Sequence, residues 1–140
     1  GVDYWGAVYN YSKALCEKNA ASEGVASRCV FQHGDAKQLD FPDESFDVVI
    51  SNYVYHNVMG ADMQKLLLES LRVLKKGGVF ALNDDMKPKM YGDMEDFAQK
   101  LRDMGYQDVR LIDTAQEAFG SHRRAAMMML GSSRLLVGRK

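Results

Sequence analysis

Side chains able to bind polar groups or to move a proton follow the most apolar run of this sequence. The run is Phe46–Ser51, and Asn52, Tyr53, Tyr55 and His56 come soon after it. Because an imidazole ordinarily titrates near neutral pH, His56 is a candidate general base. A single histidine in a loop is more often a packed or solvated side chain, so the residues alone leave both interpretations open.

A second group of polar residues ends the next apolar run along the chain. Val79–Leu82 is followed by Asn83-Asp84-Asp85. Ligands bind beside the carboxyl ends of strands in open α/β sheets, so the polar residues after both runs are expected at one ligand-binding edge. A turn or a helix cap would use the same residues. The basic run His122-Arg123-Arg124 could bind an acidic substrate or form a solvated linker.

Strand-like and helix-like runs alternate along the chain, which predicts an α/β fold with parallel βαβ units. The predicted strands are Arg28–Gln32, Phe46–Ser51, Val79–Leu82, Val109–Ile112 and Leu135–Val137. The predicted helices are Ala7–Ser22, a run from Asp62 to an exit at Lys75-Lys76-Gly77-Gly78, and Asp93–Met104. The expected buried stripes of these helices are Tyr11, Ala14, Leu15 and Lys18, then Leu66, Leu67, Ser70, Leu71 and Leu74, then Met94, Phe97, Leu101 and Met104.

Length and charge limit what the chain can do. With 140 residues it is expected to form a single domain over residues 1–140. The net charge of −1 argues against nucleic acid as a partner, since such partners require clustered positive charge. No apolar run reaches the ~18 residues of a membrane span, and no signal peptide opens the sequence. These features predict a cytoplasmic protein without a membrane partner.

Cysteine and methionine usage adds two expectations. Cys16 and Cys29 have no zinc-site spacing, which favours two reduced thiols and no metal centre. The nine methionines indicate adaptable core packing or, alternatively, a flexible wall around an apolar substrate.

The order of these motifs resembles the later part of a class I S-adenosylmethionine-dependent methyltransferase of the small-molecule type 11 group. The matching residues are Gly34-Asp35-Ala36, the run from Phe41-Pro42-Asp43-Glu44 into Phe46–Ser51, and the strand that ends in Asn83-Asp84. The resemblance implies a Rossmann-like, mostly parallel sheet with helices on both faces. It also implies S-adenosylmethionine as the cofactor and a small molecule as the methyl acceptor.

The resemblance assigns roles to individual residues. Asp3 corresponds to the acidic residue that binds the ribose hydroxyls, and Tyr4 and Trp5 lie where the family places an apolar residue against adenine. Asp35 and the Ala36 amide would bind the adenine edge. Among the residues after Phe46–Ser51, Asn52 would lie beside the cofactor, and Tyr55 and His56 would act at the acceptor as catalytic residues.

One family motif has no counterpart in this sequence, namely the first strand with its glycine-rich turn. The expectation is therefore a domain that lacks the first strand and first helix, with impaired methyl transfer. An alternative is a non-catalytic remnant that acts as a self-associating module, a homodimer formed through exposed sheet edges. A nucleotide-binding oxidoreductase domain is a third possibility, because an acidic residue after the second strand also serves NAD.

Overall fold

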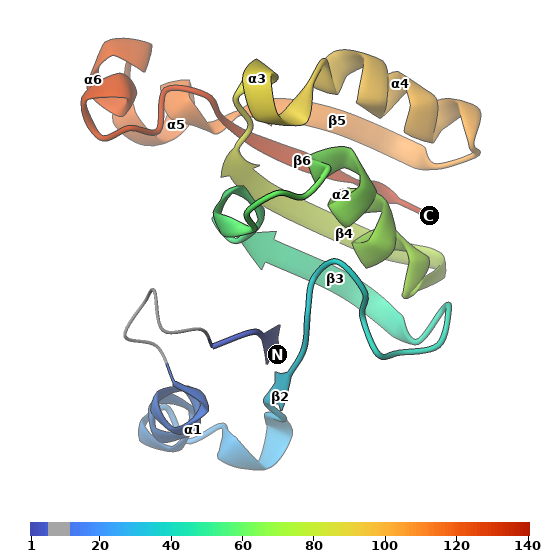
Figure 1. The fold of residues 1–140 in the computed structure, drawn as a ribbon, viewed down its shortest axis with the longest axis vertical. Coiled ribbons are helices and arrows are strands. Elements are labelled where there is room, and N and C mark those ends of the chain that lie inside the picture. Colours follow the sequence, from blue (N-terminus) through green and yellow to red (C-terminus); the bar gives the residue numbers. More distant parts are fainter. Residues whose placement is uncertain (6–11) are drawn as a thin grey trace. The chain divides into compact units, whose positions relative to one another are not determined.

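The strands form two sheets, and each sheet belongs to its own unit of the chain. The computed structural model describes residues 1–5 and 12–140 (Figure 1). The first unit, Gly1–Asp40, holds a two-stranded sheet, and the second unit, Phe41–Lys140, holds a four-stranded sheet. Across the described ranges, no helix is long and apolar enough to cross a bilayer. The single domain expected from the length stays a prediction.

Two short parallel strands organise the first unit. Strand β1 (Val2–Asp3) pairs with β2 (Gln32–His33), and Asp3 lies opposite His33. Helix α1 (Lys13–Ser22) and the 3₁₀ turn η1 (Ala26–Arg28) connect them. The predicted strand Arg28–Gln32 is therefore wrong over most of its length, because its first residue ends η1.

Helix α1 is capped locally at its start. The Ser12 hydroxyl accepts a hydrogen bond from the Leu15 amide at 3.2 Å, so the described helix begins at Lys13. The earlier part of the predicted helix, including Tyr11, lies outside the described residues. Gly24 follows the helix with φ +69°, a conformation that glycine adopts without strain, as expected for the stop. The predicted apolar stripe is wrong, because Leu15 is exposed and Ala20 is the buried residue.

The sheet of the second unit is mostly parallel, as expected. Its strands are β3 (Phe46–Asn52), β4 (Leu74–Asp85), β5 (Gln107–Asp113) and β6 (Ser133–Arg139), in the spatial order β3-β4-β6-β5. β3 and β4 are parallel, and β6 runs antiparallel to both β4 and β5. Three of the four strands therefore point the same way, and their carboxyl ends lie together (Figure 1).

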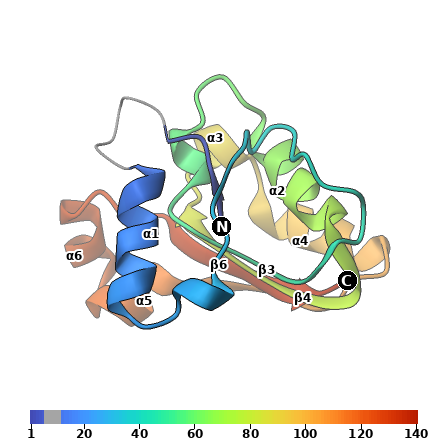
Figure 2. The same cartoon turned by 90° about the horizontal axis from the view of Figure 1, so that it is seen from below.

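Helices α2 (Met63–Arg72) and α4 (Met94–Asp103) cover one face of this sheet, as Figure 2 shows. Asp62 and Asp93 cap them by accepting hydrogen bonds from backbone amides of the first turn. The short elements η2 (Tyr55–Asn57), α3 (Pro88–Tyr91), α5 (Thr114–Phe119) and α6 (His122–Met127) follow strand ends. The core beneath α2 and α4 includes Leu67, Leu71, Leu82, Phe97, Leu101 and Leu136.

Two details of this unit differ from the sequence predictions. Helix α2 ends at Arg72, and the pair Gly77-Gly78 lies within β4, where its register against β3 shifts. A side chain on Gly78 would lie 2.8 Å from the Asp47 carbonyl oxygen, so glycine is required for strand contact and not for a helix exit. Met104, expected on the buried stripe of α4, is 54% exposed.

Candidate active site

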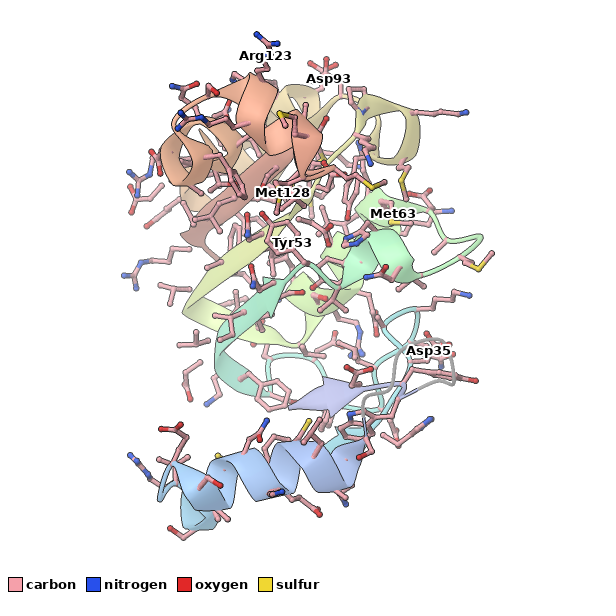
Figure 3. The ribbon with its side chains drawn as sticks, turned by 90° about the vertical axis from the view of Figure 1, so that its left-hand side faces the viewer. Asp35, Tyr53, Met63, Asp93, Arg123 and Met128 are labelled. Atoms are coloured by element: carbon pink, nitrogen blue, oxygen red, sulfur yellow. The ribbon has the colours of Figure 1, made fainter. Side chains whose placement is uncertain are left out.

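Polar side chains from all four strands gather at the carboxyl edge of the parallel strands in the second unit. β3 leads into η2, β4 ends at Asp84 and Asp85, and β6 begins at Ser133 on the same edge. Figure 3 looks onto this edge and labels Tyr53 and Met63 there. The polar residues that follow β3 and β4 thus lie at the same edge of the sheet, as predicted.

A buried carboxylate holds the imidazole of His56. Asp84 is fully buried, and its Oδ1 lies 2.5 Å from His56 Nδ1. Its Oδ2 accepts hydrogen bonds from the Tyr55 amide at 2.8 Å and the His56 amide at 3.4 Å, and Oδ1 accepts from the Asp85 amide at 2.7 Å. With three amide donors, Asp84 acts as an ionised acceptor, so His56 Nδ1 donates and Nε2 keeps its lone pair.

His56 remains open to a ligand despite this anchor. Its side chain is 31% exposed, whereas the carboxylate behind it has no exposure. A neutral imidazole with a free Nε2 can take a proton from a bound molecule, and the buried carboxylate then stabilises the positive charge. The geometry therefore suits a general base held in one orientation.

The turn after β3 fixes a tyrosine beside this imidazole. Tyr53 has φ +54°, a region that costs energy for residues other than glycine. Its amide donates to the Asn83 carbonyl at 2.8 Å, and its hydroxyl lies 2.6 Å from Ser133 Oγ. The rings of Tyr53 and His56 meet edge to face with centroids 6.4 Å apart. The contacts of the Tyr53 amide and of the Tyr53 hydroxyl hold the strained turn in place.

A chain of hydrogen bonds crosses the whole edge. Asn83 Nδ2 donates to Asn52 Oδ1 at 2.8 Å, and Thr114 Oγ1 donates to Asn83 Oδ1 at 3.2 Å. Thr114 Oγ1 also lies 2.7 Å from Ser133 Oγ. These bonds join the ends of β3, β4 and β5 to the start of β6, so they hold the four strand ends in register around His56.

Two tyrosines lie behind the imidazole and not in the open part of the site. The Tyr55 hydroxyl is buried and lies 2.8 Å from Ser70 Oγ on α2, and burial raises its pKa. Tyr91 is buried as well, and its hydroxyl forms no hydrogen bond within the described residues. Burial and the neighbouring Asp84 carboxylate raise the Tyr91 pKa. The Tyr55 amide, and not its side chain, reaches the Asp84–His56 pair.

Most of the residues predicted to bind a cofactor lie in the first unit at one edge of its sheet, whereas Asn52 ends β3 in the second unit. Asp3 ends β1, and Asp35 and Ala36 follow β2 in a turn. The Asp3 Oδ1 atom accepts from the Trp5 amide at 3.0 Å, and the Asp35 Oδ1 atom accepts from the Lys37 amide at 2.8 Å. For residues 1–5 and 12–140, the second oxygen of each carboxylate accepts no hydrogen bond, so both can still bind hydroxyl or amino groups.

Aromatic residues accompany these carboxylates. Tyr4 packs on His33, with ring centroids 5.0 Å apart, and Trp5 has φ +43°. An adenosine offers vicinal hydroxyls, an amino group and a flat ring. Carboxylates and aromatic rings at one sheet edge fit those groups.

Sequence reasoning underrated Asp84 and did not single out Ser133 or Thr114. Asp84 follows an apolar strand as part of Asn83-Asp84-Asp85, a pattern that a turn or cap explains equally well. Ser133 and Thr114 carry no local signal, because their roles depend on strand pairing. The described residues include no group of three or more possible metal ligands, and Cys16 and Cys29 are free thiols.

Two curated relatives and one solved structure are similar to this chain. The uncharacterized methyltransferase YcgJ of Bacillus subtilis is 32% identical over 107 residues, which are 75% of this chain and 42% of that protein. The 27-O-demethylrifamycin SV methyltransferase of Amycolatopsis mediterranei is 31% identical over 102 residues, 73% of this chain and 36% of that protein. This chain thus spans less than half the length of both.

The solved structure is that of phospholethanolamine N-methyltransferase 2 of Haemonchus contortus, in complex with phosphomonomethylethanolamine and S-adenosylhomocysteine. The two chains align with a TM-score of 0.69 over 100% of this chain and 43% of the other chain. Their sequences are 16% identical, so the comparison shows that the folds are similar. Residues 1–82 also match the family described as a methyltransferase domain, a range that runs from β1 into β4 and includes Asp3, Asp35 and His56. The match covers more than half of the sequence, and the chain therefore belongs to this methyltransferase family.

Proposed function

We propose that this chain is part of an S-adenosylmethionine-dependent methyltransferase that acts on a small molecule in the cytoplasm. The Asp84–His56 pair at the carboxyl edge is the observation that carries the proposal, because it provides an oriented base where the α/β architecture places ligands. Family membership supports the same reaction class.

For the cofactor, most of the proposed contacts come from the first unit. The free oxygens of Asp3 and Asp35 would accept from the ribose hydroxyls and the adenine amino group, and the Ala36 amide would donate to the adenine ring. Tyr4 and Trp5 would pack against that ring, and Asn52 is proposed beside the methionine part. When bound, S-adenosylmethionine supplies a methyl group activated by a sulfonium.

For the acceptor, we assign the proton transfer to His56. Its Nε2 would take the proton of the acceptor hydroxyl or amine, while Nδ1 keeps its hydrogen bond to Asp84. The Tyr55 side chain is packed against α2, so we propose Tyr55 as a positioning residue whose amide fixes Asp84. The remaining catalytic effect would come from holding the acceptor in line and excluding water.

A second proposal is the non-catalytic, self-associating module. β3 is an edge strand of its sheet, and Ile50 on it is 77% exposed, with Val48 also exposed. A bare apolar edge of this kind recruits other strands, so a homodimer through β3 is the proposed assembly.

One titration separates the two proposals. Saturable, one-to-one binding of S-adenosylhomocysteine to the folded chain, measured by calorimetry, supports the methyltransferase. Methyl transfer is expected to be impaired in this chain, so transfer of label from tritiated S-adenosylmethionine should be slow, and His56→Gln should lose it while keeping the binding. If the folded chain binds neither S-adenosylhomocysteine nor S-adenosylmethionine and forms stable dimers, the result supports the self-associating module and rejects the methyltransferase.

A further inference from the structure

Two buried polar groups of the second unit are neighbours without a hydrogen bond between them. Tyr91, the last residue of α3, is 1% exposed, and its hydroxyl forms no hydrogen bond within residues 1–5 and 12–140. Burial raises the pKa of this hydroxyl, and the charge of the nearby Asp84 carboxylate adds to the effect. A buried hydroxyl without a partner is costly, so a phenol left unpaired beside a carboxylate needs a physical reason.

The reason is that the Asp84 carboxylate has no lone pair left for another donor. Oδ1 accepts hydrogen bonds from His56 Nδ1 and the Asp85 amide, and Oδ2 accepts from the Tyr55 and His56 amides. A carboxylate offers about four lone-pair sites, two on each oxygen, and three amides and one imidazole occupy all of them. Tyr91 is therefore an additional donor beside a saturated acceptor.

The donors to Asp84 differ in how easily they can leave. The three amides belong to η2 and to the end of β4, so their positions are fixed by the backbone of those elements. The His56 imidazole is on a side chain that is 31% exposed and can change its rotamer. The ring is therefore the donor that can leave Oδ1 while the backbone around the carboxylate stays in place.

Contacts that do not involve His56 hold Tyr91 in position. The Tyr91 amide donates to the Lys87 carbonyl at 2.9 Å within the turn of α3. The Tyr91 carbonyl accepts from Gln64 Nε2 of α2 at 2.8 Å, which ties α3 to the helix that covers the sheet. The phenol thus remains beside Asp84 whether or not the imidazole is bonded to it.

From these observations we infer that Tyr91 is a reserve hydrogen-bond donor for Asp84. When the His56 ring leaves Oδ1 with its Nδ1 proton, the carboxylate stays ionised, and the Tyr91 hydroxyl donates to the lone pair that the ring has vacated. Without this replacement a buried charge would lose a partner, which strongly disfavours release of the ring. Tyr91 is thus a positioning residue that lets the imidazole turn toward a bound molecule. This role rests on the proposed function of His56 as the base, whereas the exchange of donors can be tested apart from it.

The first test is a double-mutant cycle measured by urea unfolding. With His56 present, Tyr91→Phe should leave the unfolding equilibrium constant unchanged or lower it by up to about fivefold, since the hydroxyl has no partner to lose. In a His56→Ala background the same substitution should raise the constant roughly tenfold or more, because Asp84 then loses its replacement donor. Tyr55→Phe is the matched control: its buried hydroxyl bonds Ser70, so its effect should be the same in both backgrounds.

The second test keeps His56 in place, and it decides the matter even where His56→Ala does not fold. Nuclear magnetic resonance relaxation dispersion of labelled histidine rings detects a sparsely populated second position of the His56 ring. Tyr91→Phe should lower the population of this released position roughly tenfold, since its carboxylate partner would then be left unpaired. The rings of His33 and His122 should give the same relaxation in both proteins.

The inference is overturned if Tyr91→Phe has the same effect on unfolding with and without the imidazole, as it would if water took the vacated lone pair. It is also overturned if the wild-type His56 ring shows no released position, or if Tyr91→Phe leaves the population of that position unchanged. A titration with S-adenosylhomocysteine tests the reaction class separately. Coupling between Tyr91 and His56 in a chain that does not bind this compound keeps the reserve donor and rejects the methyltransferase. Binding without coupling keeps the methyltransferase and rejects the reserve donor.

Discussion

Asp84 Oδ1 and His56 Nδ1 lie 2.5 Å apart, although 28 positions separate the two residues in the sequence. Parallel pairing of β3 with β4 brings them together, because it places the end of β4 beside the turn that leads from β3 into η2. The buried carboxylate also accepts the amides of Tyr55 and His56, so the same residue fixes both the backbone and the ring of the proposed base.

Asp84→Asn should change the tautomer of His56. An asparagine amide can donate to Nδ1, and the proton of the imidazole would then move to Nε2, the atom proposed to act as base. Nitrogen-15 spectra of labelled histidine measure this directly, with His33 and His122 as internal controls. An unchanged His56 tautomer in a folded variant would show that Asp84 does not orient the ring.

The two buried tyrosines should respond differently to loss of their hydroxyls. Tyr55→Phe removes the partner of Ser70 Oγ inside the protein and should cost about 1–3 kcal/mol of unfolding free energy. Tyr91→Phe removes a buried hydroxyl that forms no hydrogen bond, so stability should hold or rise by up to about 1 kcal/mol. Urea unfolding of the two variants gives the comparison, and equal losses would contradict it.

Alkaline pH should destabilise the second unit through the same residues. Burial raises the pKa of Tyr55 and of Tyr91, with the Asp84 carboxylate adding to the effect at Tyr91. In the unfolded chain both ionise near pH 10, while in the folded chain they stay neutral, so the unfolded state loses protons first. The two tyrosines therefore contribute fully to the unfolding free energy below about pH 10, and this contribution falls as the pH rises further.

The check is the unfolding free energy measured from pH 8 to pH 11. Tyr91→Phe should flatten the decline, and Tyr4→Phe, which changes an exposed ring, should leave it unaltered. A decline of the same slope in all three proteins would assign the loss to other groups.

The starts of α2 and α4 and the main strands of the second unit were predictable because their signals are local. Asp62 and Asp93 each precede an apolar periodic run, and each caps the helix that follows it. The predicted helix exit at Gly77-Gly78 was wrong. Two lysines before two glycines are typical of a helix end, but here the pair lies within a strand. In the structure the reason for Gly78 is the Asp47 carbonyl of a neighbouring strand, a contact that no local pattern records.

The same difference applies to the candidate site. The residues that follow strands could be named in advance, since strand ends in α/β sheets carry ligands. The partners Asp84, Thr114 and Ser133 could not be ranked, because their function depends on register between strands far apart in sequence. The antiparallel insertion of β6 between β4 and β5 brings Ser133 to Tyr53, and alternation of strands and helices alone predicts parallel neighbours.

Asp35→Ala should weaken binding of the cofactor by about 1–2 kcal/mol without loss of structure. Asp43→Ala is the matched control: Asp43 is also an exposed acidic residue, but it pairs with Arg72 at 2.7 Å and lies outside the proposed cofactor contacts. Calorimetric titration of each variant with S-adenosylhomocysteine measures the difference. If both substitutions weaken binding equally, Asp35 is a turn residue and not a cofactor ligand.

Ile50→Lys should suppress self-association through β3. Ile50 is 77% exposed in the middle of an edge strand, and a lysine at an edge opposes pairing with a second copy because two like charges would meet there. Light scattering over a concentration series should show a wild-type mass that rises toward the dimer and an Ile50→Lys mass that stays at the monomer. Met104→Lys, directly after α4 and away from the edge, should behave like wild type. A wild-type chain that remains monomeric at every concentration and unfolds cooperatively would reject edge pairing.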